Sequence, residues 1–226
     1  MLKNFFVLLL LLIHPYLASE EETLEKKSRK SRLLLITGCG RSGTTFITKF
    51  LNLNGVKVAH ETDAPDGMVS WYLAVESDEA ICCPGSNRFK FKHIFHQVRD
   101  PLKTIASMSQ EPVLAWNYVC SFIPQVKMTQ TGMVRAAKYW YYWNLRAEMK
   151  SEWTYRIEDI DAVVKKMSHK LGIKLDPALL AKVPRDTNTR HYNVTCTWAK
   201  LRKILRPSMY ERIVSMAKRY GYPVED

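Results

Sequence analysis

The segment from Arg32 to Leu53, RLLLITGCGRSGTTFITKFLNL, constrains the fold of this chain more than any other. Its first part, Leu33 to Ile36, is a short continuous apolar run, which is typical of a strand buried on both faces. A glycine-rich turn follows, and apolar residues then recur with helical spacing from 44 to 54. A strand, a glycine turn and a helix N-terminus together form an anion cradle, because unpaired amides and the positive end of the helix dipole point into the turn. The segment therefore predicts a phosphate or sulfate site.

The turn itself reads Gly38-Cys39-Gly40-Arg41-Ser42-Gly43-Thr44-Thr45. In the common nucleotide-triphosphate loop, GxxxxGK[ST], a lysine after the last glycine reaches the terminal phosphates. Here no lysine follows Gly43, and the cation is Arg41, which precedes Ser42. This arrangement, GxxRSGTT after a buried strand, resembles the 5'-phosphosulfate loop of the sulfotransferase family, whose donor is 3'-phosphoadenosine 5'-phosphosulfate (PAPS). The alternative is a glycine turn that binds nothing, and the agreement of strand, loop, cation and helix speaks against it.

A second motif follows the segment from Phe89 to Val98, FKFKHIFHQV, whose alternation predicts a strand. The strand ends in Arg99-Asp100-Pro101, and a helix is predicted from 102 to 109, because proline suits a first helical turn. The guanidinium of Arg99 and the hydroxyl of Ser107, two helical turns further on, can converge on one phosphate. An RDPxxxxxS segment of this kind binds the donor's 3'-phosphate in the sulfotransferase family, which is a second resemblance. The alternative for Arg99 is a surface ion pair with Asp100 or another acid.

Two candidates for a catalytic base follow a second predicted strand, residues 56 to 59. The strand ends at His60-Glu61-Thr62-Asp63, and ligands bind beyond the carboxyl ends of the strands in open parallel sheets. The protein-tyrosine sulfotransferases carry Glu-Glu-Thr at the corresponding place. We rank Glu61 before His60 and expect only one of them to face the donor, because alternate strand residues point oppositely. The alternatives are a structural histidine for His60 and an ion pair with a lysine or arginine for Glu61.

The resemblance implies a PAPS-dependent sulfotransferase with an α/β fold, a three-layer open parallel sheet whose P-loop-like core is flanked by helices, over residues 32–226. The loop from Gly38 to Thr45 would hold the 5'-phosphosulfate, Arg41 would stabilise the leaving group, and no metal would be needed. Arg190 and His191 are candidates for the adenine-binding loop. The lysine-containing, GEKTP-like segment of many relatives is absent, so no second catalytic lysine is assigned.

The remaining elements are predicted from apolar spacing and from turn residues. Helices are expected at 68–75, 131–150, 198–205 and 207–220, with a short helix starting at Pro177. The aromatic residues between 139 and 143 are assigned mostly to the core. A strand is expected at 153–157, followed by Glu158-Asp159 as the cap of a helix that runs to Leu171. The segment from 80 to 88 reads as an irregular connection, and the segment from 185 to 192 as a polar basic loop.

The N-terminus and the cysteines indicate an extracytoplasmic compartment. Residues 1–18 carry one positive charge and an apolar stretch from Phe5 to Ile13, which is typical of a secretory signal peptide or a short signal anchor. Residues 19–31 are a charged, flexible lead-in. We therefore expect the lumen of the secretory pathway, such as the Golgi, or secretion, with a membrane contact only if the N-terminal segment is retained as an anchor. Asn193 begins a glycosylation acceptor sequence.

Five cysteines are present, and in an oxidising lumen some should pair. We expect Cys39, inside the loop, to stay free, and either Cys82 or Cys83 to join Cys120 or Cys196. No CxxC pair or HExxH motif indicates a metal site.

The formal net charge of +12 favours anionic partners such as nucleotides, acidic glycans or acidic peptides. Nucleic acid is excluded as the expected partner, because the basic residues are scattered and no nucleic-acid-binding module is recognised. The leading interpretation is a single-domain sulfotransferase acting on a hydroxyl or an amine of a glycan or protein. The alternatives are a nucleotide or small-molecule kinase that uses the same loop, and a catalytically silent secreted protein that keeps the fold.

Overall fold

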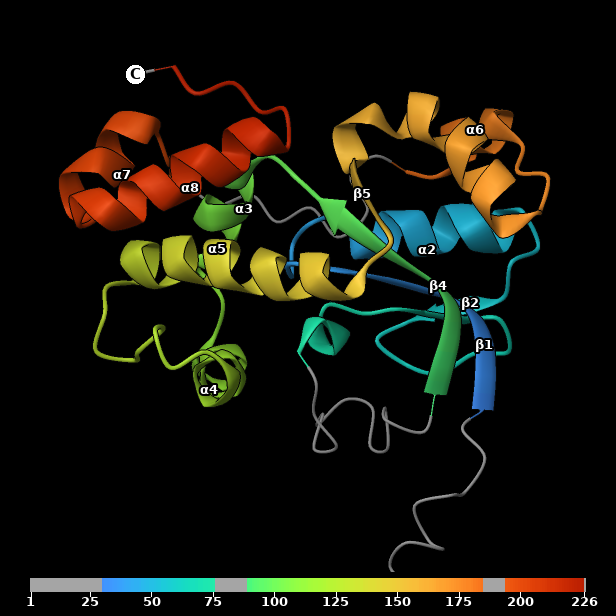
Figure 1. The fold of residues 1–226 in the computed structure, drawn as a ribbon, viewed down its shortest axis with the longest axis horizontal. Helices are drawn as coiled ribbons and strands as arrows, with labels where there is room; N and C mark the ends of the chain where they lie inside the picture. Colours follow the sequence, from blue (N-terminus) through green and yellow to red (C-terminus); the bar gives the residue numbers. More distant parts are fainter. Residues whose placement is uncertain (1–29, 76–88, 185–193, 226) are drawn as a thin grey trace, which may run out of the picture.

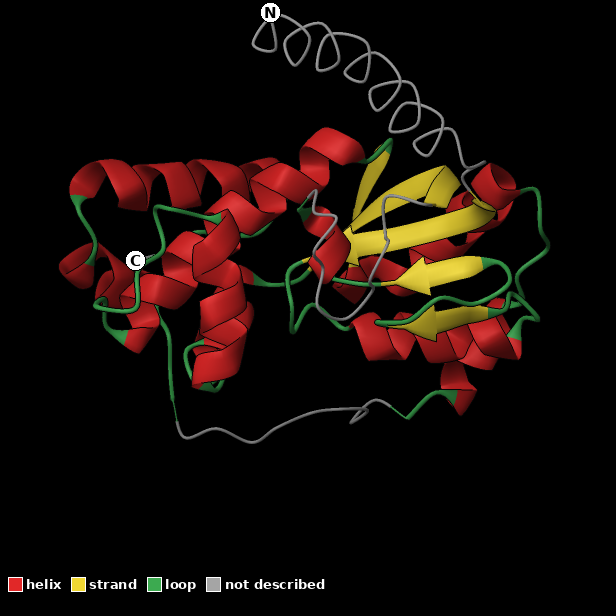
Figure 2. Ribbon diagram, turned by 90° about the horizontal axis from the view of Figure 1, so that it is seen from below, coloured by secondary structure: helices red, strands yellow, loops and turns green. Residues whose placement is uncertain are grey.

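The computed structural model describes residues 30–75, 89–184 and 194–225, and its centre is an open sheet in which all paired strands are parallel. The strand order is β2-β3-β1-β4-β5, which confirms the predicted open parallel sheet of an α/β fold. The strands are β1 (Lys30–Gly38), β2 (Val58–His60), β3 (Gly67–Val69), β4 (Phe89–Val98) and β5 (Trp153–Arg156). Figure 2 shows their carboxyl ends pointing to the same side, toward a cluster of helices.

Helices cover the sheet on one face through α2 (Thr44–Leu53) and α6 (Ile160–Leu171). The two-residue period of β1 divides its apolar side chains between the two faces. Leu34 and Ile36 pack in the cluster formed with α2 and α6, whereas Leu35 packs with Met68 and Leu73 in a separate cluster. The strand is therefore buried on both faces, as its continuous apolar sequence predicts.

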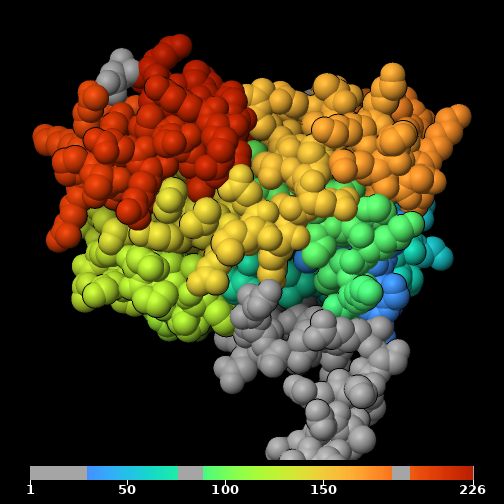
Figure 3. Space-filling view, viewed as in Figure 1, coloured from blue at the N-terminus to red at the C-terminus, as the bar shows by residue number. Residues whose placement is uncertain are grey.

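The other helices form an aromatic-rich body that lies largely beyond the carboxyl ends of the strands, and one of them, α5, also contacts β1 and β4 (Figure 1). They are α3 (Pro101–Met108), α4 (Val113–Phe122), α5 (Gly132–Lys150), α7 (Trp198–Ile204) and α8 (Pro207–Arg219). Tyr139, Trp140 and Trp143 of α5 are fully buried, so the predicted long helix and the core role of most of its aromatics are confirmed. In the space-filling view of Figure 3, α5 lies between the C-terminal helices and α4.

The segment predicted as a helix at 68–75 is instead the strand β3 followed by a short 3-10 turn, η1 (Tyr72–Ala74). Gly67 decides the difference. It adopts φ +135°, and a Cβ atom there would lie 1.8 Å from the carbonyl oxygen of Leu34 on β1. The missing side chain lets the two strands approach, and three residues of strand are too short to show a two-residue period.

Three smaller predictions also change. The second strand begins two residues later than predicted, at Val58, and ends at His60. The short helix at Pro177 is the 3-10 helix η4 (Pro177–Lys182). Asp159 lies at the N-cap of α6 after a 3-10 turn, η3 (Ile157–Asp159), but its carboxylate makes no capping bond. The carboxylate pairs instead with Arg156, whose Nε lies 2.6 Å from Oδ2. The predicted position of the cap is therefore confirmed, but the side chain bonds to a charged partner and not to the helix amides.

Among the cysteines, Cys39, Cys120 and Cys196 are free thiols. Cys82 and Cys83, the predicted partners of Cys120 or Cys196, lie outside the described residues, as do the signal segment, the lead-in up to residue 29 and Asn193. Within the described ranges, no helix combines the length and the apolar character needed to span a membrane.

Candidate anion site at the carboxyl edge of the sheet

The predicted loop leads from β1 into α2, and its backbone is unusual at two positions. Gly43, directly before the first residue of α2, adopts φ +92°, and Arg41 adopts φ +69°. Glycine enters this left-handed region freely, whereas a residue with a Cβ atom pays about 1–2 kcal/mol. The conformation of Arg41 therefore indicates that surrounding contacts hold the loop in place.

Two side chains from the end of β4 hold carbonyl groups of the loop. Gln97 Nε2 donates to the carbonyl oxygen of Ser42 at 2.8 Å, and Arg99 Nη1 donates to that of Arg41 at 3.0 Å. In a trans peptide unit the carbonyl and the following amide point in opposite directions. The bond from Gln97 therefore turns the amide of Gly43 away from β4. Within the described residues this amide donates no hydrogen bond, which leaves it available to an anion at the start of α2.

Gln97 is itself fixed by Tyr155 on β5, whose hydroxyl donates to Gln97 Oε1 at 2.7 Å. Both side chains are buried, and burial raises the pKa of Tyr155 well above its usual value, so the phenol keeps its proton. The chain of bonds from β5 through β4 to the carbonyl of Ser42 thus links the shape of the loop to the packing of the sheet.

The N-terminal part of the loop is anchored on α5. The amide of Gly40 donates to the hydroxyl oxygen of Tyr139 at 2.7 Å, so this amide is engaged within the protein. Cys39 is buried, with Sγ 3.7 Å from the carbonyl oxygen of Trp140, and burial raises the pKa of its thiol. The thiol is therefore neutral and packs against α5, on the side of the loop that faces the helical body.

The structure brings the two predicted anion-binding motifs together. Arg41 Nε donates to Ser107 Oγ on α3 at 2.9 Å and lies 3.7 Å from Glu111 Oε1. Arg99 contacts the carbonyl of the same Arg41. Arg99 does not pair with Asp100, the surface ion pair considered as the alternative. The carboxylate of Asp100 instead accepts a hydrogen bond from the amide of Lys103 and caps α3.

His60 lies beside the loop and Glu61 lies beside His60, so the structure brings both candidates for the base to this edge of the sheet. His60 Nε2 lies 2.9 Å from Thr44 Oγ1, 3.4 Å from Thr45 Oγ1 and 3.4 Å from Glu61 Oε1. The alternation rule holds only inside a strand, and β2 ends at His60. Glu61 adopts φ +61°, and this turn brings its carboxylate back beside the imidazole.

The electrostatic setting suits a proton acceptor. Burial lowers the pKa of His60, so its imidazole is neutral at pH 7 and can accept a proton. The Glu61 carboxylate accepts a hydrogen bond from Ser70 Oγ at 2.7 Å, which fixes its orientation. A carboxylate in this position can take up a proton or stabilise a protonated imidazole.

Several residues of the site were not identified from the sequence: Ser70, Gln97, Glu111, Tyr139 and Tyr155. Gln97 offered one signal, because it is a polar residue one position before the end of β4, at the predicted ligand edge. The others act across long sequence separations and offered none. Arg190 and His191 lie outside the described residues. Across the three described ranges, no group of three or more His, Cys, Asp or Glu residues is placed to hold a metal ion.

Comparison with known proteins gives a structural similarity and no sequence match. No protein-family model matches the sequence, and no curated protein matches it significantly. Among solved structures, the chain is similar to the crystal structure of the mouse sulfotransferase SULT7A1 complexed with PAP. The TM-score is 0.41 and the sequence identity is 12%, over 84% of this chain and 83% of that chain.

Proposed function

We propose that this protein is a sulfotransferase, which transfers a sulfuryl group from PAPS to a hydroxyl or an amine of a glycan or protein acceptor. One observation carries the proposal. The cation of the loop, Arg41, sits inside the turn instead of after its last glycine, and both members of the second motif, Arg99 and Ser107, contact it. Two separate sequence resemblances thus meet at one place in the fold.

The groups present match the charge changes of sulfuryl transfer. The bond between sulfur and the 5'-phosphate oxygen breaks, its electron pair stays on that oxygen, and the acceptor oxygen forms the new bond to sulfur. Arg41 would balance the charge on the departing phosphate, while the amides at the start of α2 and the hydroxyls of Thr44 and Thr45 would hold the phosphosulfate. Glu61, with His60 beside it, would take the acceptor's proton.

The compartment and the acceptor class are parts of the same proposal. The signal-like residues 1–18 and the glycosylation sequence at Asn193 favour the secretory lumen. The net charge of +12 favours an acidic glycan or an acidic peptide as acceptor.

Ligand binding followed by turnover tests the proposal. The purified lumenal chain is titrated with 3'-phosphoadenosine 5'-phosphate (PAP) in a thermal-shift assay, with ATP plus magnesium as the comparison, and is then incubated with labelled PAPS and a panel of glycans and peptides. Stabilisation by PAP together with labelled product supports the sulfotransferase. Stabilisation by magnesium-ATP instead would favour a kinase. Stabilisation by PAP with no transfer to any acceptor would favour a catalytically silent protein.

A further inference from the structure

A cavity of about 440 Å³ lies at the far end of the helical body, where α5 meets the junction of α7 and α8. Three cations line it: Lys127 from the connection before α5, Lys138 from α5 and Arg206 at the N-cap of α8. Among the described residues, no aspartate or glutamate lines it. The cavity therefore gathers positive charge that no carboxylate of its own wall offsets.

Lys138 is the central cation of this cavity. Its side chain is half-buried, and its Nζ donates to the carbonyl oxygen of Gln125 at 3.1 Å. Burial lowers the pKa of Lys138, and the neighbouring charges of Arg206 and Lys127 lower it further. Like charges held together in this way repel one another, and an anion bound between them would relieve the repulsion.

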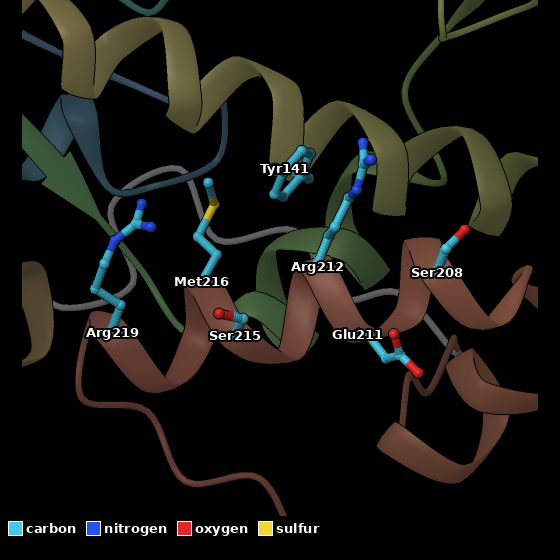
Figure 4. A pocket seen from close by; sticks show the side chains of 7 residues that line it. All are labelled: Tyr141, Ser208, Glu211, Arg212, Ser215, Met216 and Arg219. Atoms are coloured by element: carbon cyan, nitrogen blue, oxygen red, sulfur yellow. The ribbon is translucent and has the colours of Figure 1, made fainter.

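A neighbouring cavity on the same helix pair provides a contrast. It has a volume of about 330 Å³ and lies along α5 and α8, where Tyr141 faces Arg212 (Figure 4). Glu211 is part of its wall, and Arg219 at its end pairs with Glu148. Carboxylates are therefore present at this cavity, where Glu148 pairs with Arg219, whereas none of the described residues that line the cavity around Lys138 carries one.

Apart from Gln130, the rest of the wall around Lys138 is apolar, formed by Val134, Ile204, Leu205 and Met209. A ligand that fits this cavity must therefore carry several closely spaced negative groups and also an apolar surface. A sugar ring with sulfate or carboxylate groups has both, because its C–H face can lie on the apolar side while its charged groups meet the cations. An acidic peptide carries one charge per residue, and consecutive residues are about 3.3–3.6 Å apart along an extended chain, so it spreads its charges along a line instead of gathering them in one cavity.

We propose that the cavity formed by Lys127, Lys138 and Arg206 is a second anion site, separate from the loop, that binds a sulfated or carboxylated sugar residue of an acidic glycan. This site goes beyond the proposed transfer reaction. Its elements do not include β1, α2 or the loop between them, and its occupancy can be measured without turnover.

Binding of a heparin-derived hexasaccharide to the full chain tests the site. Lys138→Met keeps the aliphatic stem and removes the charge, and Arg206→Gln removes an exposed charge at the start of α8. Loss of one hydrogen bond to a charged group predicts about tenfold weaker binding for each variant. Arg212→Gln is the matched control, because it removes an exposed arginine of the same helix from the neighbouring cavity, and we expect its affinity to change less than twofold.

Thermal unfolding and the PAP-induced shift are measured for all three variants, and we expect both to match the parent protein. Equal losses of hexasaccharide affinity in Arg206→Gln and Arg212→Gln would overturn the proposal, since they would indicate attraction to overall charge alone. Unchanged affinity in both cavity variants would also overturn it. A glutamate oligomer of equal charge that binds as tightly, with the same dependence on Lys138 and Arg206, would replace the glycan by an acidic peptide.

Discussion

Gln97 offers the sharpest test of how the loop is held. Its amide joins Tyr155 on β5 to the carbonyl of Ser42, and all three residues are buried. Gln97→Leu keeps a side chain of similar size and removes both hydrogen bonds. The buried carbonyl of Ser42 and the buried hydroxyl of Tyr155 then lose their partners together.

The magnitude follows from these two orphaned groups. Each buried polar group left without a partner costs about 1–3 kcal/mol, so Gln97→Leu should lower the free energy of unfolding by about 2–6 kcal/mol. Tyr155→Phe leaves the bond to Ser42 in place but orphans the buried Oε1 of Gln97, so it should cost about 1–3 kcal/mol. In the double variant neither the Tyr155 hydroxyl nor Gln97 Oε1 is present to be orphaned, so the two effects should fall short of additive by at least about 2 kcal/mol.

Chemical denaturation of the four proteins measures the stability effects, and calorimetric titration with PAP measures the loop. We expect Gln97→Leu to weaken PAP binding more than its stability loss predicts. Without the hydrogen bond from Gln97, the peptide unit between Ser42 and Gly43 can rotate, and the amide of Gly43 no longer points toward the anion. Tyr155→Phe should bind PAP nearly as the parent does. Parental PAP affinity in a folded Gln97→Leu protein would refute the reasoning that this bond orients the cradle.

Three further changes test other parts of the site and the core. Gly43→Ala should cost about 1–2 kcal/mol of stability and abolish PAP binding, whereas Gly55→Ala, at φ +79° with no atom within 4 Å of the added Cβ, should cost a similar amount and leave binding intact; loss of binding in both would contradict this. Glu61→Gln should abolish sulfuryl transfer while PAP binding survives, with the exposed Asp161→Asn as a charge-matched control, and a fully active Glu61→Gln protein would exclude the residue as base. Burial lowers the pKa of His96 to about 4 from 6.5, so the unfolded chain binds more protons between these values, and stability should fall by up to about 3 kcal/mol as the pH drops through this window. Denaturation curves at pH 7 and pH 4.5 measure this fall, which His96→Gln should reduce; an unchanged fall would place its origin elsewhere.

Helix α4 shows why one element was missed in the sequence. Its first residues, Val113 and Leu114, are 61% and 80% exposed, while Trp116 and Val119 are fully buried. Apolar residues therefore occupy both faces of the helix, and no amphipathic stripe marks it. By contrast, α5 has the length and the buried aromatic positions that a sequence pattern can reveal, and it was predicted to within one residue at its start.

The sequence by itself determined the parts of the site that are local. A buried strand, a glycine at a left-handed position and a helix start lie within about twenty residues, and Arg99 and Ser107 lie two helical turns apart. Backbone conformation and helix periodicity fix such relations, so the loop and its companion motif could be identified before the fold was known.

Only the tertiary structure decided what orients these groups. Tyr155 meets Gln97 across 58 residues of sequence, and Tyr139 meets Gly40 across 99. Glu61 reaches His60 through a left-handed turn that the strand pattern did not reveal, and Lys127, Lys138 and Arg206 gather only because α5 packs beside α8. These contacts depend on how helices and strands pack together, and no local pattern of residues specifies that packing.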